Sequence, residues 1–281
     1  MKKVFLMMPA LLIAACGKSV DGQADDGMQS VVFHVSGDFR RPTFTRGELT
    51  ADGKEMTDLW CIDYVDGSCV QSVRQTEDDA DWGSPVLSLT IGSHTVYFVA
   101  SRGDEPTLDE DNGCITWSVP RDTFLGSVSL TVSSSGSGSR SVTLDRVATK
   151  LKLTVADEVP STLSQIDIKP AHWYYGLDYV TGEAVDDDDM VRTVNVPSTY
   201  HGTAGSLSLS IYGISTASEW TTALTVTAKD GDGGSISTVS IPSAPFKANR
   251  TTEYAGRMFS SGEGFGISLN TEWLEPLTGT W

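Results

Sequence analysis

The chain has 281 residues, of which 37 are acidic and 20 are basic, and its formal net charge at neutral pH is −17. Nucleic-acid binding is not expected, because contacts to phosphate require lysine and arginine side chains. The same acidity argues against attachment to anionic lipid surfaces through charge alone. The length suits one large domain or two of ordinary size.

The first fifteen residues resemble a secretory signal. A short basic start precedes an almost wholly apolar run at residues 4–15. This run is too short to span a bilayer comfortably, but it has the length of the apolar core of a signal peptide. Ala14 and Ala15 stand directly before Cys16, an ending that resembles a bacterial lipobox. The resemblance implies cleavage before Cys16 and lipidation of that cysteine; the alternative is an ordinary signal peptide that ends near a cysteine.

A polar segment follows at residues 16–27 and predicts a flexible tether. Its acids, Asp25 and Asp26, resemble the surface-export signals of some Gram-negative lipoproteins, and a plain spacer is the alternative. We therefore expect residues 1–15 to be a signal peptide and the remaining chain to be anchored by lipid to the outer membrane, facing outward.

From residue 30 onward, apolar and polar residues alternate in short runs separated by Gly, Asp and Ser clusters. This pattern predicts strands at residues 31–35, 86–91, 94–100, 115–119, 128–132, 147–155, 207–211, 224–228 and 236–241. No segment has a sustained helical period. The sequence therefore predicts an all-β protein built of antiparallel β-sandwiches.

The stretch 133–139 is rich in Ser and Gly and is the most linker-like part of the chain after the tether. It predicts an N-terminal β-sandwich domain over residues 28–140 and a C-terminal one over 141–281. A long hairpin loop between two flanking strands is the alternative.

Three cysteines follow Cys16, at Cys61, Cys69 and Cys114. Residues 60–70 predict a hairpin around an Asp66-Gly67 turn. A two-residue turn there places Cys69 opposite Tyr64 and Cys61 opposite Ser72, with the two thiols on different faces. We therefore expect no disulfide within this hairpin, and we interpret all three cysteines as small, mostly buried hydrophobic residues.

No pattern typical of an enzyme is present, so we expect no catalytic residues, no cofactor and no metal. The histidines are scattered and lack a motif-bound partner; they are His34, His94, His172 and His201. Acidic clusters at residues 186–189 and 230–234 could bind calcium, but a solvated loop is the preferred interpretation at both.

The densest aromatic cluster lies at residues 172–179. Its rings could form a glycan platform, and the alternative is packing within a sandwich. The candidate ligand-contacting residues are Trp173, Tyr174, Tyr175 and Tyr179. This cluster supports an alternative function as a monomeric, surface glycan-binding lipoprotein.

Several stretches together resemble the fimbrillin-like proteins, which are the subunits of type V pili. They are residues 44–47, 56–60, 94–100, 144–153, 246–256 and 267–273. The resemblance implies two transthyretin-like β-sandwich domains and export as a lipoprotein. It also implies assembly with other pilus subunits by β-strand exchange, after an Arg-specific protease removes the first strand.

Arginines that could be cut follow the first predicted strand, at Arg40, Arg41 and Arg46. The alternative is that they are solvated loop residues. The last eight residues are interrupted by Pro276 and Gly279, which makes them a poor donor strand. The sequence therefore favours an anchor or accessory subunit that keeps its lipid at Cys16, accepts a neighbouring subunit, and has a host or glycan ligand as a further partner.

Overall fold

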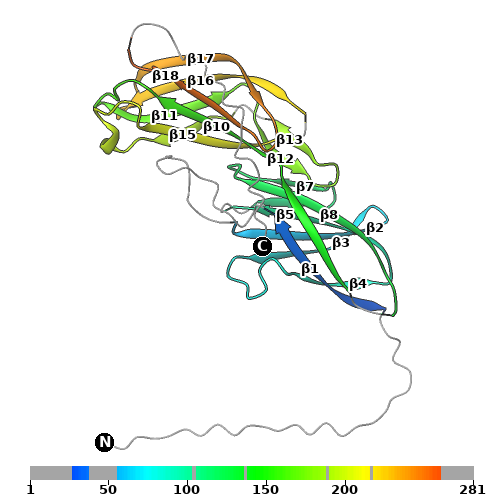
Figure 1. Ribbon diagram of the computed structural model, residues 1–281. Coiled ribbons are helices and arrows are strands. Elements are labelled where there is room, and N and C mark those ends of the chain that lie inside the picture. The colour runs from blue at the N-terminus through cyan, green and yellow to red at the C-terminus, as the bar shows by residue number, and fades with distance from the viewer. Residues whose placement is uncertain are drawn as a thin grey trace, which may run out of the picture.

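The computed structural model describes residues 27–37, 56–102, 106–135, 138–187, 190–215 and 218–260 (Figure 1). Within these ranges the chain forms strands and one short 3₁₀ turn, Ser198–Tyr200, with no α-helix. The prediction of an all-β protein is confirmed. None of the described residues forms a helix long and apolar enough to cross a membrane.

Seven strands form what we call the N-terminal unit, in the order β3-β2-β5-β8-β9-β1-β4. One layer holds β2 (Asp58–Val65), β3 (Ser68–Thr76), β5 (Gly92–Ser101) and β8 (Thr123–Val132). The other holds β1 (Met28–Gly37), β4 (Val86–Thr90) and β9 (Ser139–Arg146). Among the described strands, backbone pairing joins the two layers at one end of β8 and β9, where Phe124 pairs with Arg146 and Leu125 with Asp145.

Alternation along the strands creates the core of this unit, because successive side chains point to opposite faces of a sheet. Val31, Phe33 and Val35 of β1 are buried between the layers, whereas Ser30 and His34 are exposed. Phe33 meets Phe98 of β5 with ring centroids 5.2 Å apart. The core is therefore shared by the two layers and depends on β1.

Seven further strands form the C-terminal unit around a core of their own. Its three-stranded sheet has the order β15-β10-β18, and its four-stranded sheet has the order β14-β11-β16-β17. The bounds are β10 (Ala148–Val155), β11 (Leu163–Pro170), β14 (Arg192–Asn195), β15 (Leu207–Ile214), β16 (Trp220–Asp230), β17 (Ser235–Phe246) and β18 (Thr251–Gly256).

The two units share one pairing pattern. In each, the first strand lies between the last strand, to which it is parallel, and the fourth, to which it is antiparallel. Thus β1 between β9 and β4 corresponds to β10 between β18 and β15. The expectation of purely antiparallel sandwiches is wrong at these two parallel pairs, which bring together strands from opposite ends of each unit.

A third sheet, β13-β12-β7-β6, lies between the two units (Figure 1). It is built from two hairpins, one inserted in each unit: β6 (Thr107–Asp109) with β7 (Cys114–Thr116), and β12 (Tyr174–Asp178) with β13 (Glu183–Asp187). Its buried residues Ile115 and Leu177 pack on Ile62 and Val99, on the outer face of β2 and β5. This small sheet therefore covers part of that face.

The Ser- and Gly-rich stretch 133–139 falls between β8 and β9, and β9 pairs with both β1 and β8. Only Val147 separates β9 from β10, so the strand expected at 147–155 follows directly on a strand of the N-terminal unit. The predicted domain limits, and the transthyretin-like character of each unit, stay predictions.

The hairpin around Asp66-Gly67 forms as expected, with positive φ at both turn residues and Cys69 opposite Tyr64. The position of Cys61 was predicted wrongly. An irregularity after Asp63 shifts the register by one residue, so Cys61 lies opposite Val73. All three described cysteines are free thiols; Cys61 is buried, and the other two are half-buried. Burial raises the pKa of each thiol.

Candidate functional site

Strand β1 occupies a central place in its layer. Residues 28–32 pair with β4, and residues 32–37 pair with β9. Two backbone bonds extend this contact beyond β4, from Phe33 N to Pro85 O at 2.9 Å and from Val35 N to Gly83 O at 2.9 Å. Both edges of β1 are therefore hydrogen-bonded, and its apolar side fills the core.

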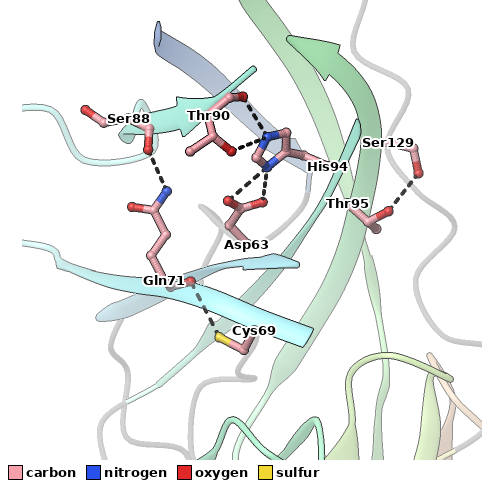
Figure 2. Close-up of polar contacts among 8 residues, drawn as sticks. All are labelled: Asp63, Cys69, Gln71, Ser88, Thr90, His94, Thr95 and Ser129. Carbon is pink, nitrogen blue, oxygen red and sulfur yellow. Dashed lines mark hydrogen bonds and ion pairs between the residues drawn. The ribbon is translucent and has the colours of Figure 1, made fainter. Parts of the chain in front are cut away.

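Strand β4 has β1 as its only sheet partner among the described strands, but a buried polar bridge also holds it. His94 Nδ1 lies 2.9 Å from Asp63 Oδ1, and His94 Nε2 lies 2.9 Å from the carbonyl oxygen of Thr90 (Figure 2). Both ring nitrogens face oxygen atoms, and Nε2 also lies 3.4 Å from the Thr90 hydroxyl. His94 thus links β4 to β2 across the end of the core.

A second polar contact reaches β4 from the opposite layer. Gln71 Nε2, on β3, donates to the carbonyl oxygen of Ser88 at 2.9 Å (Figure 2). Together, Gln71 and His94 attach β4 to the opposite layer at two carbonyl groups. These contacts are independent of β1.

A groove of about 690 Å³ lies on the outer face of β5 and β8, next to the third sheet. Its floor carries hydroxyl side chains, including Thr95 and Ser129, whose oxygens lie 3.2 Å apart (Figure 2). Tyr64 and Tyr97 line one side, with ring centroids 5.5 Å apart and an edge-to-face arrangement. The groove is therefore a polar surface bounded by aromatic rings.

The phenol groups beside the groove form a hydrogen-bonded chain. The hydroxyl of Tyr64 donates its one hydrogen to the carbonyl oxygen of Glu110 at 2.8 Å. The hydroxyls of Tyr64 and Tyr179 lie 3.0 Å apart, so Tyr179 is the donor in the bond between them. Burial raises the pKa of Tyr64, Tyr97 and Tyr179 above the usual value. These phenols consequently stay protonated and neutral at physiological pH.

Two tight turns of the third sheet form the remaining wall of the groove. Asp178 Oδ1 accepts from the backbone N–H groups of Val180 and Thr181, each at 2.9 Å. In the other turn, Asn112 donates to Asp109 through its backbone at 3.1 Å and its amide at 2.8 Å. Each turn is fixed by its own side chains before any ligand arrives.

The aromatic cluster at residues 172–179 is divided by the fold. Trp173 is 0 % exposed and donates from Nε1 to the carbonyl oxygen of Tyr212, while Tyr179 is 1 % exposed. Neither ring can offer a face to a ligand. Tyr174 and Tyr175 are half-buried, so ligand contact by this cluster stays a prediction that rests on these two residues.

Sequence reasoning missed Tyr64 and Tyr97 as groove residues. Tyr97 lies in a strand that is apolar on both faces, and such strands predict burial rather than a binding surface. The signal that could have found them is positional: Tyr64 stands just before the Asp66-Gly67 turn, and loops carry function more often than strand centres do.

The other histidines and the acidic clusters noted in the sequence do not form a common cluster in the structure. His172 pairs with Asp187 at 2.7 Å, and His201 Nε2 lies 2.8 Å from the carbonyl oxygen of Leu163. Asp230 accepts from the backbone of its own turn. No group of three or more potential metal ligands occurs in the part of the chain that the structure describes.

Several predictions fall outside the described residues. They concern the lipidation of Cys16, the tether, cleavage at Arg40, Arg41 or Arg46, and the final segment from residue 261 onward. Each stays a prediction.

Two solved structures of similar fold come from Bacteroides ovatus. A "putative adhesin" from Bacteroides ovatus is 12 % identical, with a TM-score of 0.53, over 89 % of this chain and 97 % of that one. A second "putative adhesin" from Bacteroides ovatus ATCC 8483 is 10 % identical, with a TM-score of 0.51, over 82 % and 87 %. The tip fimbrial protein Mfa3 from Porphyromonas gingivalis is 14 % identical, with a TM-score of 0.45, over 88 % and 100 %. At these identities, the likeness to the first two establishes the fold.

The sequence itself places the chain in a family. It belongs to the family of unknown function DUF6562, which matches residues 116–280. The match begins at the end of β7 and includes the whole of the C-terminal unit. No curated protein is similar to this chain in sequence.

Proposed function

We propose that the chain is a cell-surface lipoprotein without enzymatic activity that serves as a subunit of a pilus or fimbria. In this role it is an anchor or accessory adhesin, held in the outer membrane through lipid on Cys16. It joins other subunits by β-strand exchange, in which a partner strand takes the place of β1 while β1 stays attached to the lipidated end of the chain. The two units are, in this proposal, the transthyretin-like domains of a fimbrillin-like protein.

The position of β1 carries the proposal. The strand precedes all other described strands, so it can leave the fold, with or without a cut after Gly37, and no other described element is interrupted. Its departure would leave β9 and β4 with unpaired edges on either side of an apolar slot. A strand from another chain could fill such a slot, with main-chain hydrogen bonds for affinity and side-chain pockets for register.

The contacts of β4 fit this role. A strand that loses its only described sheet partner would usually detach. Here His94 and Gln71 keep two carbonyl groups of β4 attached to the opposite layer. The slot would therefore keep its width while it is empty. The fold likeness to "putative adhesins" and the lipobox-like ending at Cys16 support the same assignment.

Mass spectrometry of the protein from the cells that make it tests this function. An anchor subunit is expected as a chain that begins at an acylated Cys16 and is recovered with fibres in the outer-membrane fraction. A chain that begins after Arg40, Arg41 or Arg46, for example at Gly47, would replace the anchor role with that of a processed stalk subunit. An unlipidated monomer, absent from fibres and membranes, would contradict the proposal.

A further inference from the structure

We propose that the groove on the N-terminal unit is a binding site for neutral oligosaccharides. It lies on the outer face of β5 and β8, whereas β1 lies in the opposite layer. The inference therefore does not depend on strand exchange, and it goes beyond the proposed role as a pilus subunit.

The position of the third sheet creates the site. Side chains on the outer face of β5 alternate with buried ones, and the third sheet packs over Val99 and Tyr97. Beyond Tyr97 the same face continues without this cover, as Thr95 and Ser93, beside Ser129 of β8. A flat row of hydroxyl groups thus begins where the aromatic wall ends. The volume of about 690 Å³ is in the range of small-ligand sites.

The chemistry of the lining favours a polyhydroxylated ligand. The exposed carboxylates Asp66 and Asp111 can accept hydrogen bonds from sugar hydroxyls, and such charge-assisted bonds are stronger than neutral ones. The amide of Asn112 and the hydroxyls of the floor can both donate and accept. The half-buried ring of Tyr97 supplies an apolar face for the C–H groups of a sugar ring.

The charge of the groove lining restricts the class of ligand that can bind. Neither lysine nor arginine is among the residues that line the groove, and three aspartates are, namely Asp66, Asp111 and Asp178. Sugars that carry carboxylate or sulfate groups would be repelled. An apolar peptide is disfavoured because, besides the tyrosine rings, the lining offers chiefly Val180 as an exposed apolar side chain; Leu130 is buried in the core between the layers. A neutral glycan satisfies both limits.

The site is also pre-organised. Tyr64 and Tyr179 are held by the hydrogen-bonded chain that ends on Glu110, and the turn at Asp178 is closed by its own carboxylate. At Gly113, where φ is +69°, a Cβ would lie 2.7 Å from Val180, so the two turns touch. Binding therefore requires little further ordering of these side chains and turns, and the small loss of conformational entropy favours affinity.

Binding of the unlipidated chain of residues 16–281 to an oligosaccharide array tests the site. The array carries neutral, sialylated and uronate-containing members, and the strongest neutral ligand is then measured by titration calorimetry. We expect binding to neutral members, little dependence on salt, and no binding to the acidic ones. Failure to bind any neutral member, or a preference for acidic members or for a basic peptide, would overturn the proposal.

Two variants locate the binding site. Asp111→Ala changes an exposed side chain, and Tyr97→Leu removes the ring but keeps apolar volume against the third sheet. Each should weaken binding by about tenfold or more, equivalent to about 1.4 kcal/mol. The matched control is Asp232→Ala, an exposed aspartate in a turn of the C-terminal unit, which should bind like the natural chain. Unchanged affinity in both groove variants would place the ligand elsewhere.

Discussion

Strands β1 and β10 hold the same place in the two units and differ in how firmly they are fixed. β10 pairs with eight residues of β15, whereas β1 pairs with five residues of β4 and donates two further backbone bonds to Pro85 and Gly83. On the outer side of β10, Lys150 is buried beside Tyr212 and Lys152 pairs with Glu253 at 3.0 Å. The outer side of β1 instead exposes Ser30, His34 and Ser36.

Covalent connection separates the two strands further. β10 follows β9 after a single residue and leads on to β11, so its removal would cut the chain in two. β1 can be separated by one cut. The same topology therefore gives one unit a fixed first strand and the other a first strand that one cut can release. The proposed strand exchange accordingly concerns the N-terminal unit.

The largest effect is expected from core truncation in these two strands. Phe33→Ala in β1 and Leu153→Ala in β10 each remove a buried side chain. Each should cost about 4 kcal/mol, because a cavity is added to the loss of burial. Differential scanning calorimetry should show that each change lowers the transition of its own unit. Equal loss in both units from either change would mean that the units unfold as one.

A slightly smaller effect is expected at the polar bridge beside β4. Asp63→Asn removes the charge that faces His94 in a buried site and should cost about 3 kcal/mol. The double replacement Asp63→Leu with His94→Leu should cost less than the sum of the two single replacements, because no charge is then left buried. Chemical denaturation of the four chains measures this coupling. Additive costs would show that the bridge does not act as a unit.

The exit from β18 provides a pH-dependent test in the C-terminal unit. Asp157 accepts from the backbone N–H groups of Met258, Phe259 and Ser260 at 2.9, 2.7 and 2.7 Å. Burial alone would raise the pKa of its carboxyl, but these bonds together lower it. A lowered pKa gives stability that is present above the unfolded value, about 4, and that is lost as the pH falls through the folded value.

Asp157→Asn should therefore destabilise the C-terminal unit at neutral pH by about 1–2 kcal/mol. The difference from the natural chain should shrink as the pH falls below about 4. Thermal unfolding at a series of pH values measures both effects. A difference that stays constant over this range would exclude the Asp157 carboxylate as their source.

The smallest effect is expected from replacing one turn glycine in each unit by alanine. Gly67 has φ of +80° with open space around its Cα, so Gly67→Ala should cost about 1 kcal/mol through backbone strain alone. The matched control is Gly231→Ala, also in open space but without a positive φ, and it should be close to neutral. Urea denaturation compares the two. Equal effects would show that strain at Gly67 is not the cause.

Local alternation predicted strands that build the two cores, such as 31–35 and 224–228, because burial on one face leaves a period of two in the sequence. It could not predict that β1 is parallel to β9, since the partners lie about a hundred residues apart and the pairing has no local pattern. The three-residue strand β6 gave no signal either, and the strand predicted at 115–119 overlaps β7 only at Ile115 and Thr116; the sheet that they form is completed by β12 and β13.

The groove could not be predicted from the sequence either, because its lining residues lie far apart along the chain. Tyr97, Asn112 and Thr181 come from three separate segments that meet only when the third sheet packs on β5. The sequence predicted ligand contact at residues 172–179 because the aromatic residues there are close together along the chain. Alternation and tight packing then buried Trp173 and Tyr179.

Strand exchange at β1 is tested most directly by a cut on its C-terminal side. A specific protease site is introduced within residues 38–46, the folded chain is cut, and a labelled peptide of residues 28–37 is added in large excess. We expect the label to co-elute with the cut chain, but not with the uncut chain, and a peptide carrying Phe33→Asp not to enter either. Exclusion of the natural peptide from the cut chain, as from the uncut one, would contradict an exchangeable β1.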